Sequence, residues 1–235
     1  MYGYGYKYTN GLVVSAGGGA PFANTKSLSF DGVDDYLTSA NPLTSGNAYT
    51  ISIFAKLNAT PTLTNFFNIS DGTNNIALCY WWSGGNGMLF KPNVGGPYSL
   101  TVYPNTALWH SYIFTFDGST TTKIYVDGIS REVTNGTALG TVAVNAMEIS
   151  RGLGGGYRSN MNVDEVSIFN RVVTPAEIVT LSTAPTVDLT SLNPIAWYRN
   201  GDGDTYPTIT DNGSGGNNGT MTNMDAGDIV TDVPL

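Results

Sequence analysis

The sequence predicts an all-β fold, an antiparallel β-sandwich with one short helix, and three observations support this prediction. Only 12% of the 235 residues are charged, while 29 glycines and many Thr, Asn and Ser residues supply the polarity that strand faces and turns favour. Apolar and polar residues alternate along most of the chain after residue 26. Asp-Gly pairs, which readily adopt the positive φ values of tight turns, separate several of these segments.

The alternating segments can be followed in order along the chain. Leu28 and Phe30 should face the core in the first strand, and Ile51 and Ile53 in a later one, because side chains two residues apart point to the same face. Further strands are predicted at residues 65–69, 76–82, 87–91, 99–102, 112–116, 123–126, 129–133, 146–150 and 163–169.

Turn and cap residues predict a hairpin and a helix. The Asp-Gly pair at 127–128 joins the strands on either side of it into an antiparallel hairpin. Thr174 as N-cap, Pro175 at the first helical position and Glu177 three residues after the cap form a capping box. The predicted helix is short, because Pro185 prevents its continuation.

Composition divides the chain into three parts. Residues 1–25 combine alternating Tyr and Gly with a run of glycines, a composition too flexible to build a core, so we expect an arm or connector. Repeated tyrosines suit a protein interface. The interface candidates are Tyr2, Tyr4, Tyr6 and Tyr8. Residues 26–182 form the sandwich domain, and residues 183–235 form a connector and a final segment rich in Asp, Gly, Asn and Thr.

Net charge, cysteine content and hydropathy exclude several classes of partner. The formal net charge is -8, so the cationic surface that neutralises phosphates is missing and we expect no nucleic-acid partner. Cys79 is the single cysteine, so no intrachain disulfide can form, and we expect a buried thiol. We expect no membrane insertion and no cleaved signal peptide, because the sequence has neither a membrane-length apolar run nor a secretory signal pattern.

Five motifs occur in order along the chain. They are SLSFDGVDDY at 27–36, YTISIFAK at 49–56, WHSYIFTFDGS at 109–119, KIYVDG at 123–128, and VDEVSIFNR at 163–171 followed by TPAEI at 174–178. In this order they resemble the laminin-G-like, concanavalin A-like family, as found in phage virion surface proteins. The resemblance implies a concanavalin A-like (laminin-G-like) antiparallel β-sandwich jelly roll with one short helix.

One segment departs from the order of the family. Domains of this family commonly begin with a strand that resembles residues 196–203, whereas here that segment lies near the other end. Three alternatives remain open. The domain is permuted and residues 196–221 complete its own sheet, or they complete the sheet of a neighbouring chain, or they form a separate small element.

Calcium is the cofactor that the resemblance implies, because the family often binds it through carboxylates and turn carbonyls. The corresponding residues are Asp31 with the backbone at Gly32, Asp34 or Asp35, and Asp164. Oxygen ligands of this kind suit Ca²⁺. The alternative is that Asp31 and Asp164 only cap turns and hold the sheet edge.

Sugar binding requires aromatic faces beside hydrogen-bonding loops, and residues 80–86 supply both. Two adjacent tryptophans there face opposite ways in a strand, so one should lie in the core and the other at the surface. The ligand-binding candidates are Trp81, Trp82, Asn86, Tyr157 and Asn160.

The sequence contains no recognisable catalytic arrangement. Glycoside hydrolysis needs two carboxylates, and the Glu-x-Asp-x-Glu spacing that would place them on one strand face is absent. Asp164 and Glu165 are adjacent and should point to opposite faces of a strand. His110, the single histidine, has no nucleophile motif beside it, so we expect it to be structural. We therefore expect that the protein is not an enzyme.

Taken together, these features favour a non-enzymatic virion surface module, a phage-like decoration or adhesion protein. The expected partners are cell-surface glycans or other virion proteins, with assembly as a homo-oligomer. The expected location is the virion surface or the extracellular space. One alternative is a purely structural capsid or tail decoration protein with no free ligand, and a second is a glycan hydrolase.

Overall fold

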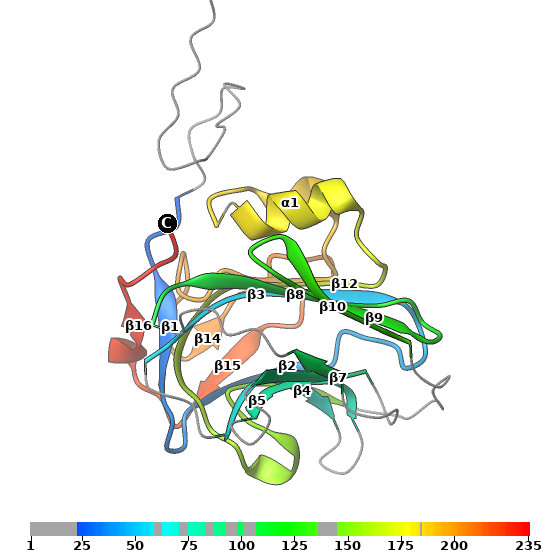
Figure 1. Ribbon diagram of the computed structural model, residues 1–235. Coiled ribbons are helices and arrows are strands. Elements are labelled where there is room, and N and C mark those ends of the chain that lie inside the picture. The colour runs from blue at the N-terminus through cyan, green and yellow to red at the C-terminus, as the bar shows by residue number, and fades with distance from the viewer. Residues whose placement is uncertain are drawn as a thin grey trace, which may run out of the picture.

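Two antiparallel β-sheets packed face to face form the body of the protein, and one helix covers the outer face of one sheet (Figure 1). The computed structural model describes residues 23–58, 63–70, 75–82, 87–92, 98–100, 107–135, 145–183 and 185–235. The predicted all-β sandwich with one short helix is confirmed. Within the described residues, no helix is long and apolar enough to span a membrane.

The first sheet has the strand order β10-β9-β8-β3-β12-β1-β16, and β13 also pairs with β12. Its strands are β1 (Ser27–Asp31), β3 (Tyr49–Leu57), β8 (His110–Phe116), β9 (Thr121–Val126), β10 (Ile129–Asn135), β12 (Asn160–Phe169), β13 (Ala196–Tyr198) and β16 (Ile229–Val230). The predicted hairpin is present between β9 and β10, where Asp127 and Gly128 have φ values of 51° and 74°.

The second sheet has the strand order β14-β15-β2-β11-β4-β5-β6-β7. Its strands are β2 (Tyr36–Ala40), β4 (Leu63–Ser70), β5 (Asn75–Trp82), β6 (Gly87–Lys91), β7 (Tyr98–Leu100), β11 (Ala146–Ile149), β14 (Thr208–Ile209) and β15 (Gly219–Thr222). Every pairing in both sheets is antiparallel.

The core between the sheets consists of the inward-facing residues that the alternation predicts. Leu28 and Phe30 are fully buried, as is Cys79. Aromatic rings fill the centre, where the ring centroids of Phe90 and Phe114 lie 5.2 Å apart. Burial of each large side chain contributes about 1.5–3 kcal/mol. The register is therefore strongly specified, because a slip of one residue would turn every such side chain toward solvent.

The helix α1 (Pro175–Thr183) lies against the outer face of the first sheet (Figure 1). Its buried Ile178 and Leu181 belong to a second apolar cluster on that face. The predicted capping box is confirmed, because the Glu177 amide donates to Thr174 Oγ1 and the Thr174 amide donates to the Glu177 carboxylate. The part of the chain that the structure describes also contains the 3₁₀ turns η1 (Leu153–Gly155), η2 (Leu189–Leu192) and η3 (Ala226–Asp228).

A β-bulge in β12 changes the direction of two acidic side chains. The pairing with β3 shifts between Asp164 and Ser167, and Glu165 has a φ of 45°. Val163 and Val166 both belong to the core, so the two residues between them both lie on the outer side. The expectation that Asp164 and Glu165 point to opposite faces is wrong, because the extra residue breaks the alternation.

The C-terminal segment pairs within its own chain. β13 pairs with β12 and β15 pairs with β2, so residues of this segment extend both sheets. The Tyr198 side chain is fully buried, and its hydroxyl lies 3.0 Å from Ser39 Oγ and 2.7 Å from the Asn217 carbonyl oxygen. The sandwich therefore continues past the expected boundary at residue 183, because the last segment supplies part of the core.

Candidate functional site

A row of polar side chains crosses the outer face of the second sheet. The strand register places Thr220 opposite Thr38, Thr38 opposite Glu148, and Glu148 opposite Asn68. Leu37, the neighbour of Thr38 in β2, is fully buried in the core. Because successive side chains in a strand alternate between faces, the row points away from the core.

The loop between β11 and β12 folds back over this row and holds its carboxylate. Arg151 Nη1 donates to Glu148 Oε1 at 2.6 Å, and Asn68 Nδ2 donates to Glu148 Oε2 at 3.4 Å. At the other end of the loop, Ser159 Oγ donates to the Asn65 carbonyl oxygen at 2.6 Å. Each oxygen of Glu148 is therefore oriented by a partner from a different element.

A cavity of about 250 Å³ opens beside this ion pair. It is lined by Ser70, Asn145, Ala146, Glu148, Arg151, Gly154 and Gly155. Gly155 has a φ of 85°, and a Cβ at this position would lie 3.1 Å from Arg151 Nη2. A side chain at residue 155 would therefore require the Arg151 guanidinium to shift by a few tenths of an ångström, and its positive φ favours glycine. The small, polar cavity suits one hydroxylated ring better than a large apolar ligand.

Tyr36 lies next to the arginines of this loop and contacts two of them. The Cζ atom of Arg151 lies 4.7 Å from the centroid of the Tyr36 ring, and that of Arg158 lies 4.9 Å from it. Both distances are within the range of a cation–π interaction, so the ring positions both guanidinium groups.

The buried amide of Asn65 adds unused hydrogen-bonding capacity to this face. Its side chain is fully buried, and neither its nitrogen nor its oxygen has a partner among the described residues. An unpaired buried polar group costs about 1–3 kcal/mol, so water or a ligand group that reaches it is stabilising.

The ligand-binding residues predicted from the sequence are only partly on this face. Trp81 is 3% exposed and lies in the core between the sheets, where a glycan cannot reach it, because its side chain points inward from β5. The side chain of Trp82 and the residue Asn86 lie outside the described residues. Tyr157 is 51% exposed in the β11–β12 loop, and Asn160 is the first residue of β12. The interface candidates Tyr2, Tyr4, Tyr6 and Tyr8 also lie outside the described residues.

Sequence reasoning overlooked four residues of this face. They are Tyr36, Glu148, Arg151 and Arg158. The signal that could have found them is that both arginines flank the glycine-rich stretch 152–156, in a chain with only 10 Lys and Arg residues.

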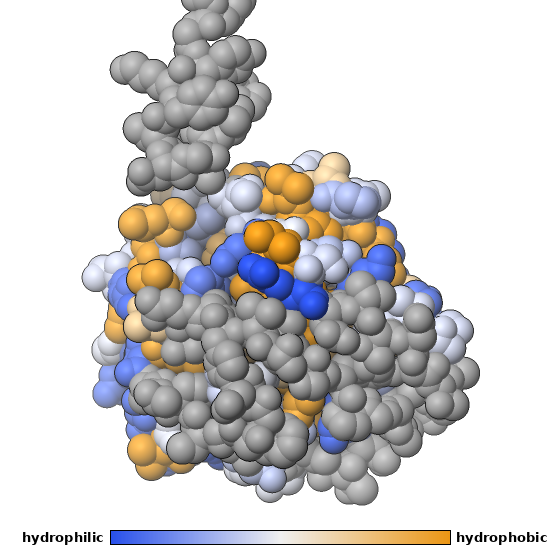
Figure 2. Space-filling view, in the orientation of Figure 1, coloured by the Kyte–Doolittle hydropathy of each residue, from blue (hydrophilic) through white to orange (hydrophobic). Residues whose placement is uncertain are grey.

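A second cavity, of about 520 Å³, lies on the outer face of the first sheet beside the C-terminal residues. The Asp232 carboxylate accepts hydrogen bonds from Trp109 Nε1 at 3.1 Å and Asn162 Nδ2 at 2.8 Å, and it pairs with Lys56. Figure 2 shows apolar surface at the end of the chain that Figure 1 marks C. Residues 232–235 form part of the wall, so this cavity is the weaker candidate for an external ligand.

His110 lies near this second cavity and has a structural partner. Its Nδ1 atom lies 2.7 Å from Asp127 Oδ2, and Asp127 Oδ1 accepts a hydrogen bond from the Ser111 amide. The three residues tie the start of β8 to the β9–β10 turn, as a structural histidine would.

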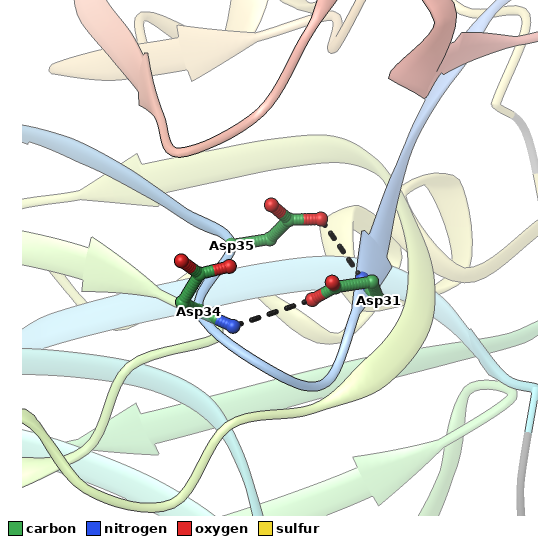
Figure 3. A group of neighbouring side chains, drawn as sticks. All are labelled: Asp31, Asp34 and Asp35. Atoms are coloured by element: carbon green, nitrogen blue, oxygen red, sulfur yellow. Dashed lines mark hydrogen bonds between the residues drawn. The ribbon is translucent and has the colours of Figure 1, made fainter.

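Three carboxylates meet at the turn between β1 and β2 (Figure 3). One oxygen from each of Asp31, Asp34 and Asp35 lies within 4.8 Å of the others. The Val33 amide donates to Asp31 Oδ1 at 2.7 Å, and the Asp31 amide donates to Asp35 Oδ2 at 3.0 Å. Burial raises the pKa of Asp35 to about 6, and neighbouring negative charges add to that effect. Backbone amides therefore occupy one oxygen of Asp31 and one of Asp35.

Asp164 does not join these three carboxylates. Asp31 pairs with Asn160, and Asp164 lies four residues further along β12, roughly 13 Å away at the rise of a strand. The structure separates the predicted calcium ligands into two places, because β12 carries Asp164 to the opposite end of β1.

Asp164 instead lies in a buried polar cluster at the β12 bulge. Arg199 Nε donates to Glu165 Oε1 at 3.1 Å, and Trp197 Nε1 donates to Glu165 Oε2 at 2.7 Å. Asp202 lies 3.6 Å from the Arg199 guanidinium. Burial raises the pKa of Asp164 well above its usual range, with a further contribution from the charge of Glu165. Burial also raises the pKa of Glu165 to about 7, against the opposing effects of Trp197 and Arg199.

The donor set of this cluster fits a divalent cation. Glu165 and Asp202 pair with the Arg199 guanidinium, and the buried Asp164 lies near both carboxylates, so the negative charge is only partly balanced. Asp164 Oδ2 and both amide atoms of the fully buried Asn200 have no hydrogen-bond partner among the described residues. Carboxylate and amide oxygens are the ligands that Ca²⁺ takes in proteins. Both oxygens of Asp202 already accept hydrogen bonds from Thr25 and Lys26, so the cluster offers a cation chiefly Asp164 Oδ2, whereas the β1–β2 turn brings three carboxylates within 4.8 Å of one another.

The chain matches one family of known proteins. A family model described as the Concanavalin A-like lectin/glucanases superfamily matches residues 31–179, more than half of the chain. None of the curated protein sequences matches the chain.

Solved structures share the fold. A candidate carbohydrate-binding protein from Bacteroides ovatus is similar with a TM-score of 0.67 and 18% identity, over 90% of this chain and 61% of that one. A heptameric SAP-like pentraxin from Limulus polyphemus has a TM-score of 0.55 and 12% identity, over 68% of this chain and 82% of that one. A sialidase variant from Streptococcus pneumoniae has a TM-score of 0.52 and 16% identity, over 68% of this chain and 28% of that one. The chain thus spans less than two thirds of the Bacteroides protein, and at these identities the likeness is one of fold.

Proposed function

This chain belongs to the Concanavalin A-like lectin/glucanases superfamily, and we propose that it is a module that binds glycans without turning them over. The observation that carries this proposal is the polar cavity beside Glu148 and Arg151. The family membership and the name of the Bacteroides protein support carbohydrate as the ligand class.

The cavity recognises a sugar ring through groups that are already oriented. Glu148 accepts hydrogen bonds from ring hydroxyls, while Arg151 donates to ring or hydroxyl oxygens. Asn68 and Arg151 hold the Glu148 carboxylate in place, so little conformational entropy is lost on binding. Tyr157, which is half exposed in the same loop, offers an aromatic face to an adjoining sugar.

Binding without turnover is favoured by the state of the one carboxylate on the cavity wall. Glycoside hydrolysis needs a second carboxylate about 5–9.5 Å away on the other side of the scissile bond. Glu148 is instead paired with Arg151 and is the acidic side chain among the described residues that line the cavity. A glycan hydrolase is the rival function, and release of reducing ends from a bound polysaccharide would favour it.

The experiment that tests the proposed function is a glycan array with the purified protein and its Glu148→Gln variant. The wild type should bind a defined set of glycans, and the variant should lose at least tenfold in affinity, because a neutral amide accepts hydrogen bonds less strongly than a carboxylate. Glu177→Gln is the control, since it removes a carboxylate from α1 on the other side of the sandwich. Equal binding by wild type and Glu148→Gln would contradict this site.

Calcium is the proposed cofactor at the Asp164 cluster, where Asp164 Oδ2 has no hydrogen-bond partner among the described residues. When bound, the ion would balance the buried negative charge beside β12. Calcium should therefore raise the melting temperature of the wild type, and Asp164→Asn should abolish that rise. Asp34→Asn is the matched control for the β1–β2 turn. Loss of the calcium effect in Asp34→Asn alone would move the site to the turn.

The proposed setting is a virion surface, where residues 1–25 attach the module and homo-oligomers present several copies of the cavity. Repeated tyrosines in that segment suit a protein interface. Removal of residues 1–25 should abolish binding to the particle while leaving glycan binding intact. A purely structural decoration protein would bind its particle and give no signal on any glycan.

A further inference from the structure

Cationic side chains gather on the glycan-binding face of a strongly acidic protein. The chain has 10 Lys and Arg residues against 18 Asp and Glu residues. Two of its arginines, Arg151 and Arg158, nevertheless contact the same Tyr36 ring beside the cavity. Two guanidinium groups at one ring form a local positive patch that attracts an anionic ligand.

Within the described residues, a carboxylate pairs with only one of these two arginines. Arg151 forms an ion pair with Glu148, but among the described residues no carboxylate lies within 4 Å of the Arg158 guanidinium. Arg158 Nη1 is buried and has no hydrogen-bond partner there, and neither has Arg151 Nε. Buried donors on a charged group are costly when unpaired, so an external anion that reaches them is stabilising.

The side chains of Arg151 and Arg158 are partly exposed, so an anion can reach them, although Arg158 Nη1 and Arg151 Nε are themselves buried. A guanidinium holds its N–H groups in one plane, where two of them can form parallel hydrogen bonds to a carboxylate. Arg151, Arg158 and Glu148 leave one net positive charge around the Tyr36 ring beside the cavity, which matches a monoanion.

We infer that the glycan bound at this face carries a carboxylated sugar, whose carboxylate pairs with Arg158 and Arg151. This inference rests on the proposed function, and it names the ligand class of the same site. The cavity beside Glu148 takes the sugar ring, and the two arginines at the Tyr36 ring take its acid group.

The test is an array of acidic glycans, each paired with its neutral counterpart in which the carboxylate is esterified, together with sulfated glycans. The carboxylated member of a pair should bind at least tenfold more tightly, and added salt should weaken its binding. Arg158→Gln should remove most of this preference, because it removes a charged donor worth roughly tenfold or more. Arg131→Gln is the control, since Arg131 is an exposed arginine on β10.

A second variant guards against loss of fold. Arg158→Lys keeps the charge but not the planar fork, so it should retain the preference for acidic glycans with reduced affinity. The inference would be overturned if the protein preferred the neutral counterparts or the sulfated glycans. It would also be overturned if the Arg158→Gln variant bound acidic glycans like the wild type. Either result would leave the proposed glycan binding intact. Silence on every glycan would overturn both.

Discussion

At the scale of single residues, burial decides how the acidic side chains at the β12 bulge behave. Glu165 accepts hydrogen bonds from Trp197 and Arg199, and both partners favour its charged form. The side chain is only 4% exposed, however, and the loss of hydration outweighs these partners, so its pKa rises to about 7. Asp164 behaves in the same way beside it.

The raised pKa of Glu165 predicts how stability depends on pH. The folded state holds the Glu165 proton more tightly than the unfolded state, for which the pKa is 4.5. The free energy of unfolding should therefore fall as the pH rises from about 4.5 to about 7, by on the order of 3 kcal/mol from this residue. Urea unfolding in chelator should show the wild type losing stability relative to Glu165→Gln across this range. A wild type that gains stability relative to the variant would contradict the account.

The role of a single residue could be predicted from the sequence where its partners are close to it along the chain. The roles of Thr174 and Glu177 could be predicted, because a capping box lies within four residues of sequence. The partnership of Arg158 with Tyr36 could not, since more than a hundred residues separate them and only the pairing of β2 with β11 brings them together.

At the scale of elements, the β11–β12 loop is the part of the fold that builds the site. It leaves the second sheet after β11 and enters the first at β12, and it places Arg151 and Arg158 over the outer face on the way. Its glycines allow the backbone to approach the Arg151 guanidinium. The loop therefore couples the position of a ligand-binding side chain to backbone conformation.

Gly155→Ala tests this coupling. The variant should lose about 1 kcal/mol of stability from the positive φ at residue 155, and its new Cβ should displace the Arg151 guanidinium. Glycan affinity should therefore fall several-fold. Gly203→Ala is the matched control, because Gly203 has a φ of 83° with no atom near the position of a Cβ. Gly203→Ala should lose similar stability and keep the glycan affinity of the wild type. Calorimetry measures the stability and the glycan affinity of both variants, and equal glycan affinities in the two would refute the coupling.

Strands with clear alternation could be predicted, and interruptions of that alternation could not. Leu28 and Phe30 face the core as expected. In β4, however, the pairing shifts between Asn65 and Phe67, so Phe66 and Phe67 both enter the core. A bulge inserts one residue and leaves no local pattern in the sequence. The same effect in β12 brings Asp164 and Glu165 to one side and creates the buried acidic cluster.

At the scale of the whole molecule, the C-terminal segment completes the sandwich that the earlier residues begin. β13 fills the position along β12 that β1 leaves open, and β14 and β15 extend the second sheet. The two sheets then present different outer faces. α1 lies over the first (Figure 1), where residues 232–235 also line a cavity. The second carries the polar row and the cavity beside Glu148.

The central claim is that glycans bind at the second sheet, in the cavity between β11 and the β11–β12 loop. Hydrogen–deuterium exchange of the wild-type protein, with and without the glycan that binds most strongly on the array, tests it most directly. We expect slower exchange in residues 145–159 and unchanged exchange in residues 107–111 and 230–235. Protection confined to the latter two segments, or no protection anywhere at saturating glycan, would contradict it.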